Sequence, residues 1–458
     1  MSRRKVSHTL LIATVNEDYR VNLLEQAQAV RARANWSLLI QCLQQLILGE
    51  EEKNRTPSSP DRLLELAIEV LLFGDFQERW DIAKIFPKLG TGAIAPLIDI
   101  LEDEDAEAEL RWFAGRILGE FSHPEVIAAV VEVLKTTQSE ELSSMASAAL
   151  GNIGSPAVAA LTELLTQENT RLLAVRALSQ IRRQETIAPL LSVVQDPEVA
   201  VRAAAIEALS SFHDPQIPPI LLSALDDIAA PVRREAVIGL SFRSDLREEL
   251  ALVNRLSPRL YDFNLEVCCA CANALGRLGT DAAATALYQV LSPHTPLNLQ
   301  IEIVRALGWL ATATSLEYLR SCLNQQLSAE LLQEIVTVLG RVEAPTLASF
   351  ATQMLLDLLQ SAHLVTQEPR VKQAIALSLG QLGDMRTIEP LIQLLAAPDL
   401  GIRLHAIAAL KQLAPEMAQQ QLEQLAAKAA LAPALRQGVA IALAEWSMAE
   451  DGVGIAWG

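Results

Sequence analysis

A short pattern of charged, small and apolar residues recurs along most of this chain and constrains its fold more than any other feature. In its clearest copy, Asp196 stands six residues before Arg202, and Arg202 stands seven residues before Leu209. The last, apolar position recurs at Phe86, Leu118, Leu150, Leu178, Leu209, Leu240, Leu275, Leu307, Leu339, Leu379, Leu410 and Leu443. These anchors are 28 to 40 residues apart, and a period of that length is typical of repeat proteins that stack one helix pair per repeat.

Glycine and proline predict where the helices of each repeat end and begin. Gly276 and Gly279 follow the anchor Leu275 closely, as glycines do at helix C-termini, and Pro96 stands near the start of the apolar segment after the anchor Phe86. No segment shows a sustained period-two alternation. The sequence therefore predicts an all-α fold, a solenoid of helix pairs in a right-handed superhelix with about twelve repeats.

The domain organisation follows from where this pattern starts and stops. Residues 1–76 are expected to form an N-terminal helical cap with a polar loop near 49–62. The repeat array is expected over residues 77–446, followed by a C-terminal tail over 447–458. Two long spacings predict inserted loops, at residues 243–264 and within residues 360–369.

Composition and charge restrict the class of partner and the compartment. The net charge is −18, which disfavours nucleic acid as a partner because phosphate binding needs clustered cations. Five unevenly spaced cysteines predict no disulfide framework and favour a cytoplasmic protein. No stretch approaches the length of apolar sequence that crosses a membrane, so no integral membrane segment is expected.

The arginine of the pattern forms a ladder along the chain. Seven residues before the anchors stand Arg79, Arg111, Arg171, Arg202, Arg233, Lys372, Arg403 and Arg436, and the aspartate six residues earlier is present as Asp105, Asp196 and Asp227. Carboxylate–guanidinium hydrogen bonds in the turn inside each repeat would tie one repeat to the next. We interpret these residues as structural, with no catalytic role.

The ladder breaks at four positions, Ser143, Cys268, Gln300 and Leu332, and the last three are consecutive. Asp262 persists although Cys268 stands in its arginine's place. Residues 262–345 are therefore either a seam, where the superhelix changes pitch or a partner docks, or a place of ordinary sequence drift.

Cys268 and Cys271 are the cofactor-binding candidates. They lie three residues apart on one side of the expected helix, and Cys271 occupies a position that is alanine in other repeats. They are either small core residues or thiols for a metal or an iron–sulfur cluster, and the family resemblance given below adds a bilin as a third possible ligand of these thiols. We predict no metal site and no catalytic residue, because the chain has no motif for either in its required context.

Aromatic residues are rare in this chain, at 4%, and three are candidates for partner binding: Trp112, Trp309 and Tyr318. Trp112 follows ladder residue Arg111 directly. A tryptophan on a concave surface suits a binding hot spot for a protein or a flat tetrapyrrole, whereas a buried one is a core wedge. The sequence leaves both interpretations open.

The repeat consensus, roughly I-x-P-L-I-x-L-L-x-D-x-x-x-x-x-R-x-x-A-x-x-A-L-G-x-L-G, resembles a HEAT-like repeat over about residues 77–446. More narrowly, it resembles the short HEAT-like repeats of cyanobacterial phycobilisome-linked proteins, including the bilin lyases of the E/F type. The resemblance implies that the helix carrying the arginine lines the concave face.

The resemblance implies a non-catalytic protein-binding scaffold for the assembly, chaperoning or turnover of phycobilisome or cofactor-containing proteins. A phycobilin lyase, which attaches an open-chain tetrapyrrole held transiently to a phycobiliprotein cysteine, is the enzymatic alternative. A partner of an iron–sulfur assembly scaffold is the second alternative. The location it implies is cytoplasmic, with thylakoid-associated phycobilisomes as a peripheral site.

Overall fold

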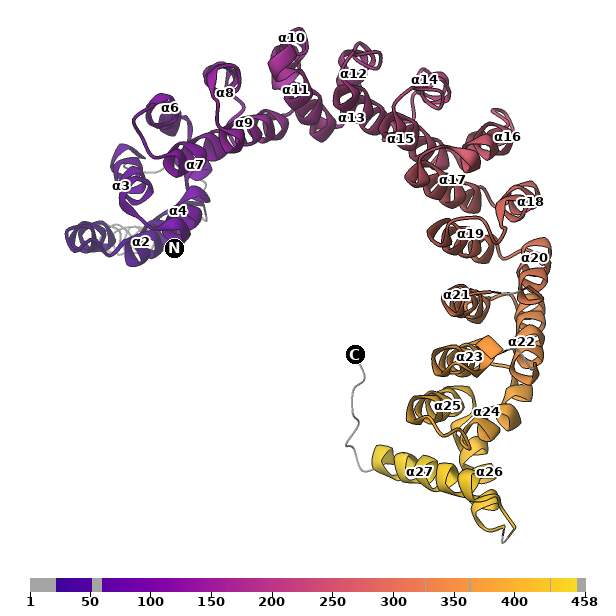
Figure 1. Cartoon of the computed structure of the whole chain (residues 1–458). Helices are drawn as coiled ribbons and strands as arrows, with labels where there is room; N and C mark the ends of the chain where they lie inside the picture. The colour runs from indigo at the N-terminus through magenta and orange to yellow at the C-terminus, as the bar shows by residue number, and fades with distance from the viewer. Residues whose placement is uncertain (1–21, 52–59, 326, 362–363, 429, 451–458) are drawn as a thin grey trace, which may run out of the picture. The chain divides into compact units, whose positions relative to one another are not determined.

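The structure is a computed structural model, and it describes residues 22–51, 60–325, 327–361, 364–428 and 430–450. No strand occurs among these residues, and helices joined by short turns make up nearly all of them (Figure 1). This confirms the prediction of an all-α helical-repeat fold. The chain divides into two compact units, residues 1–217 and 218–458, and each is described by itself.

The first unit begins, within the described residues, with a helix over residues 22–31. Ala34 follows with a φ of 50°, which turns the chain into the next helix. The helices that follow are α2 (Trp36–Glu51), α3 (Pro60–Phe73), α4 (Phe76–Ala83), α5 (Phe86–Leu89), α6 (Ile94–Glu102), α7 (Ala108–Leu118), α8 (Pro124–Thr136), α9 (Glu140–Ile153), α10 (Val158–Leu164), α11 (Glu168–Ile181), α12 (Ile187–Leu191) and α13 (Val199–Leu209).

The second unit continues the same alternation. Its helices are α14 (Ile217–Ala224), α15 (Ala230–Ser241), α16 (Leu252–Leu256), α17 (Leu265–Leu278), α18 (Asp281–Val290), α19 (Leu297–Leu310), α20 (Ala313–Leu323), α21 (Ala329–Gly340), α22 (Pro345–Gln360), α23 (Pro369–Leu382), α24 (Ile388–Leu394), α25 (Leu400–Leu413), α26 (Pro415–Ala426) and α27 (Pro433–Glu450). Short 3-10 turns precede several of the first helices, as at Met385–Thr387 before α24.

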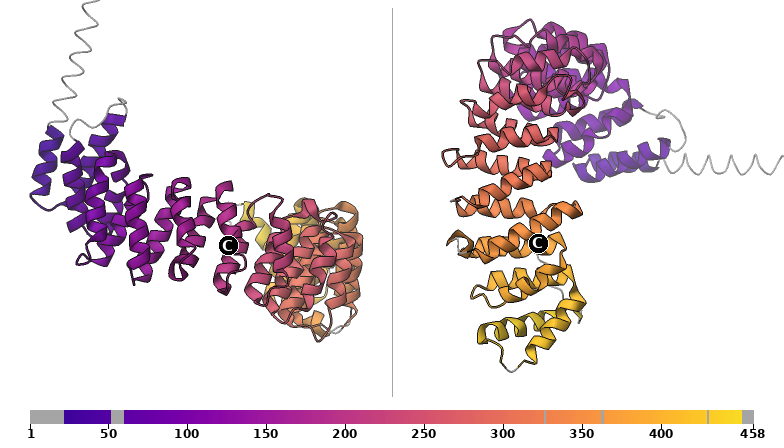
Figure 2. Two further views of the ribbon diagram at one scale, coloured as in Figure 1. Left: turned by 90° about the horizontal axis from the view of Figure 1, so that it is seen from above. Right: turned by 90° about the vertical axis from the view of Figure 1, so that its right-hand side faces the viewer.

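Each unit is built from two rows of helices. The second helices of successive repeats, which carry the anchors, pack on one another as α7, α9, α11 and α13 in the first unit and as α15, α17, α19, α21, α23 and α25 in the second. We call these the second-helix rows; the first helices, such as α18, α20 and α22, form the other row. Within the second unit, the second-helix row lies on the inner side of the bend (Figure 1), and the helices are stacked on one another along the unit (Figure 2). Anchors such as Leu150, Leu240 and Leu275 are fully buried between the rows.

Two glycines per repeat serve different purposes, although both were expected to close the helix. Gly279 adopts a φ of 70° and a ψ of 33°, the left-handed conformation that ends α17. Gly276 lies inside α17, and a Cβ added there would come within 3.0 Å of Cα and Cβ of Ala306 in α19. The first glycine therefore allows neighbouring second helices to approach closely, and only the other one reverses the chain.

Several predicted boundaries differ from the structure. The loop expected near 49–62 is helical at both ends, because α2 runs to Glu51 and α3 begins at Pro60; residues 52–59 lie outside the described residues. The insertion expected over 243–264 is wrong, since this stretch holds the first helix of its repeat, broken into 3-10 turns around α16. The longest spacing, 40 residues, separates the anchors Leu339 and Leu379. Most of its extra length comes from α22, which has 16 residues, and from a 3-10 turn at Leu364–Gln367.

Candidate protein-binding surface

The ladder arginines close the turn inside their own repeat by donating hydrogen bonds to backbone carbonyls. Arg202 Nη1 donates to the Asp196 carbonyl at 2.7 Å, and Arg233 Nη1 donates to the Asp227 carbonyl at 2.8 Å. Arg111 donates through Nε to the Leu101 carbonyl at 2.9 Å. The fixed fork of the guanidinium lets one side chain serve the carbonyls and still reach a carboxylate.

The carboxylate comes from the following repeat. Arg171 donates to Asp196 at 2.6 Å, and Arg233 donates to both carboxylate oxygens of Asp262 at 2.6 and 2.8 Å. The predicted partner six residues earlier is therefore corrected: that residue contributes its carbonyl, while the ion pair bridges two repeats. The difference is clear at Asp105, which is exposed and accepts no hydrogen bond from Arg111 in the described structure.

The remaining ladder residues differ in the partners of their side chains. Arg79 is buried and pairs with Glu109 at 2.7 Å and with Glu107 at 3.3 Å, again from the next repeat. Lys372 donates to the Gln367 side chain at 2.7 Å. Arg403 has a buried Nε with no partner, and Arg436 is exposed.

The positions where the ladder breaks keep part of its bonding. Gln300 Nε2 donates to two turn carbonyls, those of Ser292 and Thr295, each at 2.8 Å. Asp262 keeps an arginine, because Arg233 reaches it from the preceding repeat. That hydrogen bond to Arg233 is the main reason why the pKa of the Asp262 carboxyl is lowered.

The cysteine candidates lie inside the repeat packing. Cys268 Sγ donates to the Asp262 carbonyl at 3.2 Å, and Cys271 Sγ donates to the Leu256 carbonyl at 3.0 Å. Both are buried, and burial raises the pKa of each thiol. Cys269 is half-buried, and desolvation raises its pKa to about 11. No group of three or more His, Cys, Asp or Glu side chains in the described parts of the chain is placed to hold a metal ion.

Trp112 is half-buried on α7 and belongs to an aromatic cluster of the first unit. Its ring meets Phe113 edge-to-face at 5.2 Å between centroids. Arg116 lies 4.2 Å from the Trp80 ring centroid and 5.9 Å from that of Trp112. The Trp112 ring thus packs against Phe113, and the rest of the side chain is partly open to solvent on the second-helix row.

Trp309 and Tyr318 lie on different rows. Trp309, near the end of α19, is 54% exposed and makes no ring or polar contact with the rest of the described chain. Tyr318, on α20, stacks on Tyr288 with centroids 4.3 Å apart and shares a hydrogen bond with Thr285 at 3.0 Å. Of these two candidates, the structure leaves Trp309 open to solvent and uses Tyr318 in packing between first helices.

The second-helix rows present equivalent side chains to solvent in successive repeats. The residue two positions after the anchor is exposed in nearly every repeat. These residues are Lys88, Glu120, Asn152, Gln180, Ser211, Phe242, Arg277, Trp309, Arg341, Gln381 and Gln412. Phe242, Arg277 and Arg341 were not among the predicted site residues. Aligning the repeats on their anchors would have found them, because an aromatic or arginine at a solvent-facing position departs from the Ala/Leu pattern.

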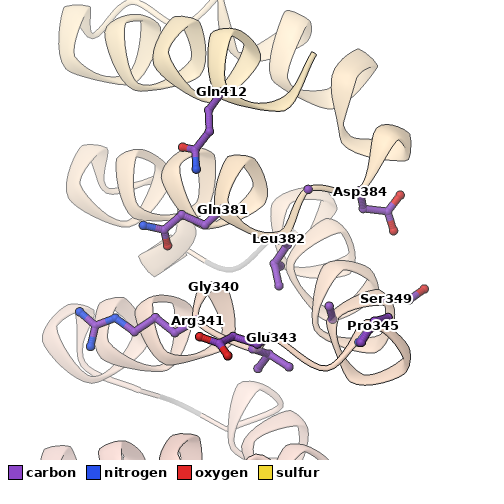
Figure 3. A pocket seen from close by; sticks show the side chains of 12 residues that line it. Gly340, Arg341, Glu343, Pro345, Ser349, Gln381, Leu382, Asp384 and Gln412 are labelled. Atoms are coloured by element: carbon purple, nitrogen blue, oxygen red, sulfur yellow. The ribbon is translucent and has the colours of Figure 1, made fainter. Parts of the chain in front are cut away.

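Three open pockets lie along these rows. One of about 470 Å³ in the first unit is lined by Trp112, Arg116 and Glu120 with residues of α9 and α11. One of about 510 Å³ lies between α15 and α17, and one of about 690 Å³ lies at the ends of α21, α23 and α25. Figure 3 shows the last, where Arg341, Gln381 and Gln412 project from three successive helices. Long polar side chains in shallow pockets suit the surface of another macromolecule.

Among the described residues, no helix has the length and apolarity needed to cross a membrane.

Comparison with known proteins identifies the repeat. The family model for HEAT repeats matches residues 94–173, 166–241 and 352–444, together more than half of the chain. The model for the PBS lyase HEAT-like repeat matches residues 267–292. No curated protein shows significant sequence similarity to the chain.

Solved structures with a similar fold include importin beta and Kap121p. Importin beta in an ammonium sulfate condition gives a TM-score of 0.52 at 13% identity, over 93% of this chain and 64% of that one. Kap121p gives 0.54 at 14% identity, over 85% and 49% of the two chains. Yeast importin-beta (Kap95p) gives 0.50 at 14% identity, over 94% and 67%.

This chain thus spans less than two thirds of importin beta and about half of Kap121p, and identities this low establish the fold alone. The family assignment comes from the repeat models. The chain belongs to the HEAT-repeat family, with a segment of the PBS lyase HEAT-like type in its second unit.

Proposed function

We propose that this protein is a binding scaffold whose protein partner docks on the second-helix rows. The observation that carries the proposal is the series of exposed side chains at one equivalent position in consecutive repeats, with Phe242 and Trp309 each more than half exposed. Solenoids offer long surfaces of this kind, and exposed aromatics supply the hot spots of such interfaces.

The partner we propose is a phycobilisome or cofactor-containing protein that the scaffold helps to assemble, protect or turn over. Support comes from the match of residues 267–292 to the PBS lyase HEAT-like repeat. This segment contains Arg277 and lies directly beside the pocket between α15 and α17. The proposed class of partner is therefore supported by one matched repeat. The proposed docking surface is supported by the exposed side chains of the whole second-helix row.

A phycobilin lyase is the second candidate, and the same repeat match favours it. A lyase has to hold an open-chain tetrapyrrole beside the acceptor cysteine of a phycobiliprotein. The pocket lined by Trp112, Arg116 and Glu120 offers a ring to stack on, a cation for a propionate and an acid for pyrrole nitrogens. The thiols of Cys268 and Cys271 are buried and donate to carbonyls, which argues against them as bilin attachment points.

The test is a titration of the full chain against purified phycobiliprotein subunits, with and without their bilin, and against free phycocyanobilin. Calorimetry reports subunit binding, and visible absorbance reports the bilin. Saturable subunit binding with no change in the bilin spectrum supports the scaffold. A red-shifted complex that passes its bilin to the acceptor cysteine supports the lyase.

Absence of both binding and transfer would remove the phycobilisome partner. Variants on the second-helix row separate a specific surface from non-specific adhesion. Trp309→Ala is expected to weaken subunit binding at least tenfold, whereas Tyr318→Phe, which keeps its stacking on Tyr288, is expected to leave binding unchanged.

A further inference from the structure

Two exposed aromatic rings alternate with two exposed arginines across four consecutive second helices. Phe242 follows α15, Arg277 lies on α17, Trp309 on α19 and Arg341 just after α21, each two positions after its anchor. Helices α15, α17, α19 and α21 pack in that order, so these side chains form one continuous line in the second unit. We call them the Arg–aromatic stripe.

The arginines of the stripe are free of ion pairs. Arg277 places its guanidinium 5.0 Å from the Phe242 ring centroid, and neither Arg277 nor Arg341 pairs with a carboxylate in the described part of the chain. By contrast, the nearby Arg305 on α19 is bound by Glu334 at 2.9 Å and by Glu302 at 2.9 Å. The two arginines of the stripe thus keep their positive charge unpaired, although the protein has a net charge of −18.

Acidic residues lie on the same surface, seven positions earlier on the helices. Glu235, Glu302 and Glu334 stand five residues before their anchors, about two helical turns or ~10 Å from the stripe. Glu235 pairs with Arg234, and Glu302 and Glu334 pair with Arg305, so the middle of this face is largely neutralised. An anionic segment is therefore attracted to the unpaired arginines of the stripe and not to the paired arginines beside them.

Helix stability alone accounts for only part of this arrangement. A cation near a helix C-terminus interacts favourably with the helix dipole, which explains Arg277 and Arg341. It does not explain Phe242 and Trp309, which are 56% and 54% exposed at the equivalent positions. Rings held in water beside unpaired arginines are instead typical of an interface that a partner covers.

The net charge of the chain favours a polypeptide over a nucleic acid as the ligand. A phosphate backbone needs clustered cations, and this chain carries a net charge of −18. Two arginines on separate helices suit single carboxylates spaced along a peptide.

We propose that the Arg–aromatic stripe binds an acidic, extended segment of the partner protein, which rests on the proposed scaffold function and specifies the chemistry of its ligand. Neighbouring helix axes are roughly 8–10 Å apart, and an extended segment in the polyproline II conformation rises ~3.1 Å per residue and turns every third side chain to the same face. One stripe position therefore corresponds to about three residues of the partner. The segment carries apolar side chains for Phe242 and Trp309 and carboxylates for Arg277 and Arg341, each at every sixth residue.

The probe is a ten-residue peptide with phenylalanine at positions 1 and 7, glutamate at positions 4 and 10, and serine and glycine elsewhere. Its binding to the full chain is measured by calorimetry up to about 1 mM peptide, the weakest affinity that still reports specific contacts. Saturable binding that weakens with salt is expected. No detectable binding would overturn the proposal.

Two double variants place the site. Arg277→Glu/Arg341→Glu is expected to lower the affinity more than tenfold, and Phe242→Ala/Trp309→Ala is expected to lower it about as much. The matched control Arg33→Glu/Arg255→Glu makes the same charge change at exposed arginines off the stripe and is expected to bind as the unchanged chain does. All four substituted stripe positions are exposed, and circular dichroism verifies that each variant folds.

A charge swap gives the sharpest readout. The same peptide with lysine at positions 4 and 10 is expected to bind the Arg277→Glu/Arg341→Glu protein better than it binds the unchanged chain. Equal binding by both proteins would refute the assigned contacts. So would binding of a 15-nucleotide oligothymidylate that the stripe variants abolish, because the site would then be one for nucleic acid.

The two proposals fail separately. If phycobiliprotein subunits bind the stripe variants as tightly as the unchanged chain, the scaffold function stands and the stripe assignment is wrong. If the peptide experiments succeed while no phycobiliprotein subunit binds, the stripe stands and the partner class is wrong.

Discussion

At the scale of single residues, the Arg233–Asp262 pair shows how one repeat is fastened to the next. Both side chains are largely buried, at 12% and 3% exposed, and the guanidinium also binds the Asp227 carbonyl. Asp262→Asn removes the countercharge and is expected to destabilise the α15–α17 contact by about 2 kcal/mol. Native-state hydrogen exchange in α17 measures this better than a melting temperature, because repeat arrays do not unfold in one step.

The control is Asp226→Asn, which breaks the pair between Arg259 and an exposed carboxylate. Such a surface pair contributes roughly 0–1 kcal/mol, so the exchange rates in α17 should barely change. Equal effects of the two substitutions would mean that the ladder has no special structural role.

The same pair makes a pH-dependent contribution. Hydrogen bonding to Arg233 lowers the pKa of Asp262 in the folded protein, so its stabilisation is fully present above the unfolded value near 3.9. It is lost as the pH falls through the lowered folded value. The stability difference between the unchanged chain and Asp262→Asn is therefore expected to shrink between about pH 5 and pH 2; a difference that grows in this range would contradict the assigned cause.

The cysteines allow a direct test of burial. Desolvation raises the pKa of Cys269 and of Cys322 to about 11 each, and Cys271 is fully buried. Little thiolate is present at pH 8, so reaction with a thiol reagent is expected to be slow in the native protein and complete in denaturant. Fast native labelling of Cys268 or Cys271 would restore them as cofactor thiols.

At the scale of helices, close packing between second helices depends on the glycine that follows the anchor. A Cβ at Gly380 would lie 2.8 Å from Cα and 2.7 Å from Cβ of Ala409 on α25. Gly380→Ala is therefore expected to destabilise the α23–α25 contact by about 1–3 kcal/mol, although alanine favours helix formation. Gly92→Ala is the control, because its nearest neighbour lies 4.0 Å away, and hydrogen exchange there should stay unchanged or slow.

The sequence predicted the helices well where a single residue determines where a helix ends or which side chain is buried in the core. The anchor leucines, the reversing glycine at Gly279 and the helix-opening prolines are local signals of this kind. The partner of each ladder arginine was misplaced, because the choice between a carboxylate six residues away and one in the next repeat depends on how repeats stack. The broken first helix around α16 was taken for a loop for a related reason: its apolar residues pack on α17 through short, irregular turns.

At the scale of the whole molecule, the proposed function depends on a property that no single repeat has. One exposed ring or arginine is unremarkable on a helix, but a line of them over four packed helices distinguishes one surface of the second unit. The sequence named Trp309 as a candidate because aromatic residues are rare here. Phe242, Arg277 and Arg341 could be recognised as surface candidates only by aligning successive repeats on their anchors.

Site-specific photo-cross-linking in cells tests the central claim, that the second-helix row is the partner surface. Trp309 is replaced by the photoreactive p-benzoylphenylalanine in one protein, and Met385, which is 46% exposed in the 3-10 turn before first helix α24, is replaced in another. We expect one predominant protein adduct from position 309, lost when Arg277→Glu/Arg341→Glu is added, and none from position 385. Adducts from position 385 alone, or an adduct at 309 that survives the charge reversal, would show that the partner docks elsewhere.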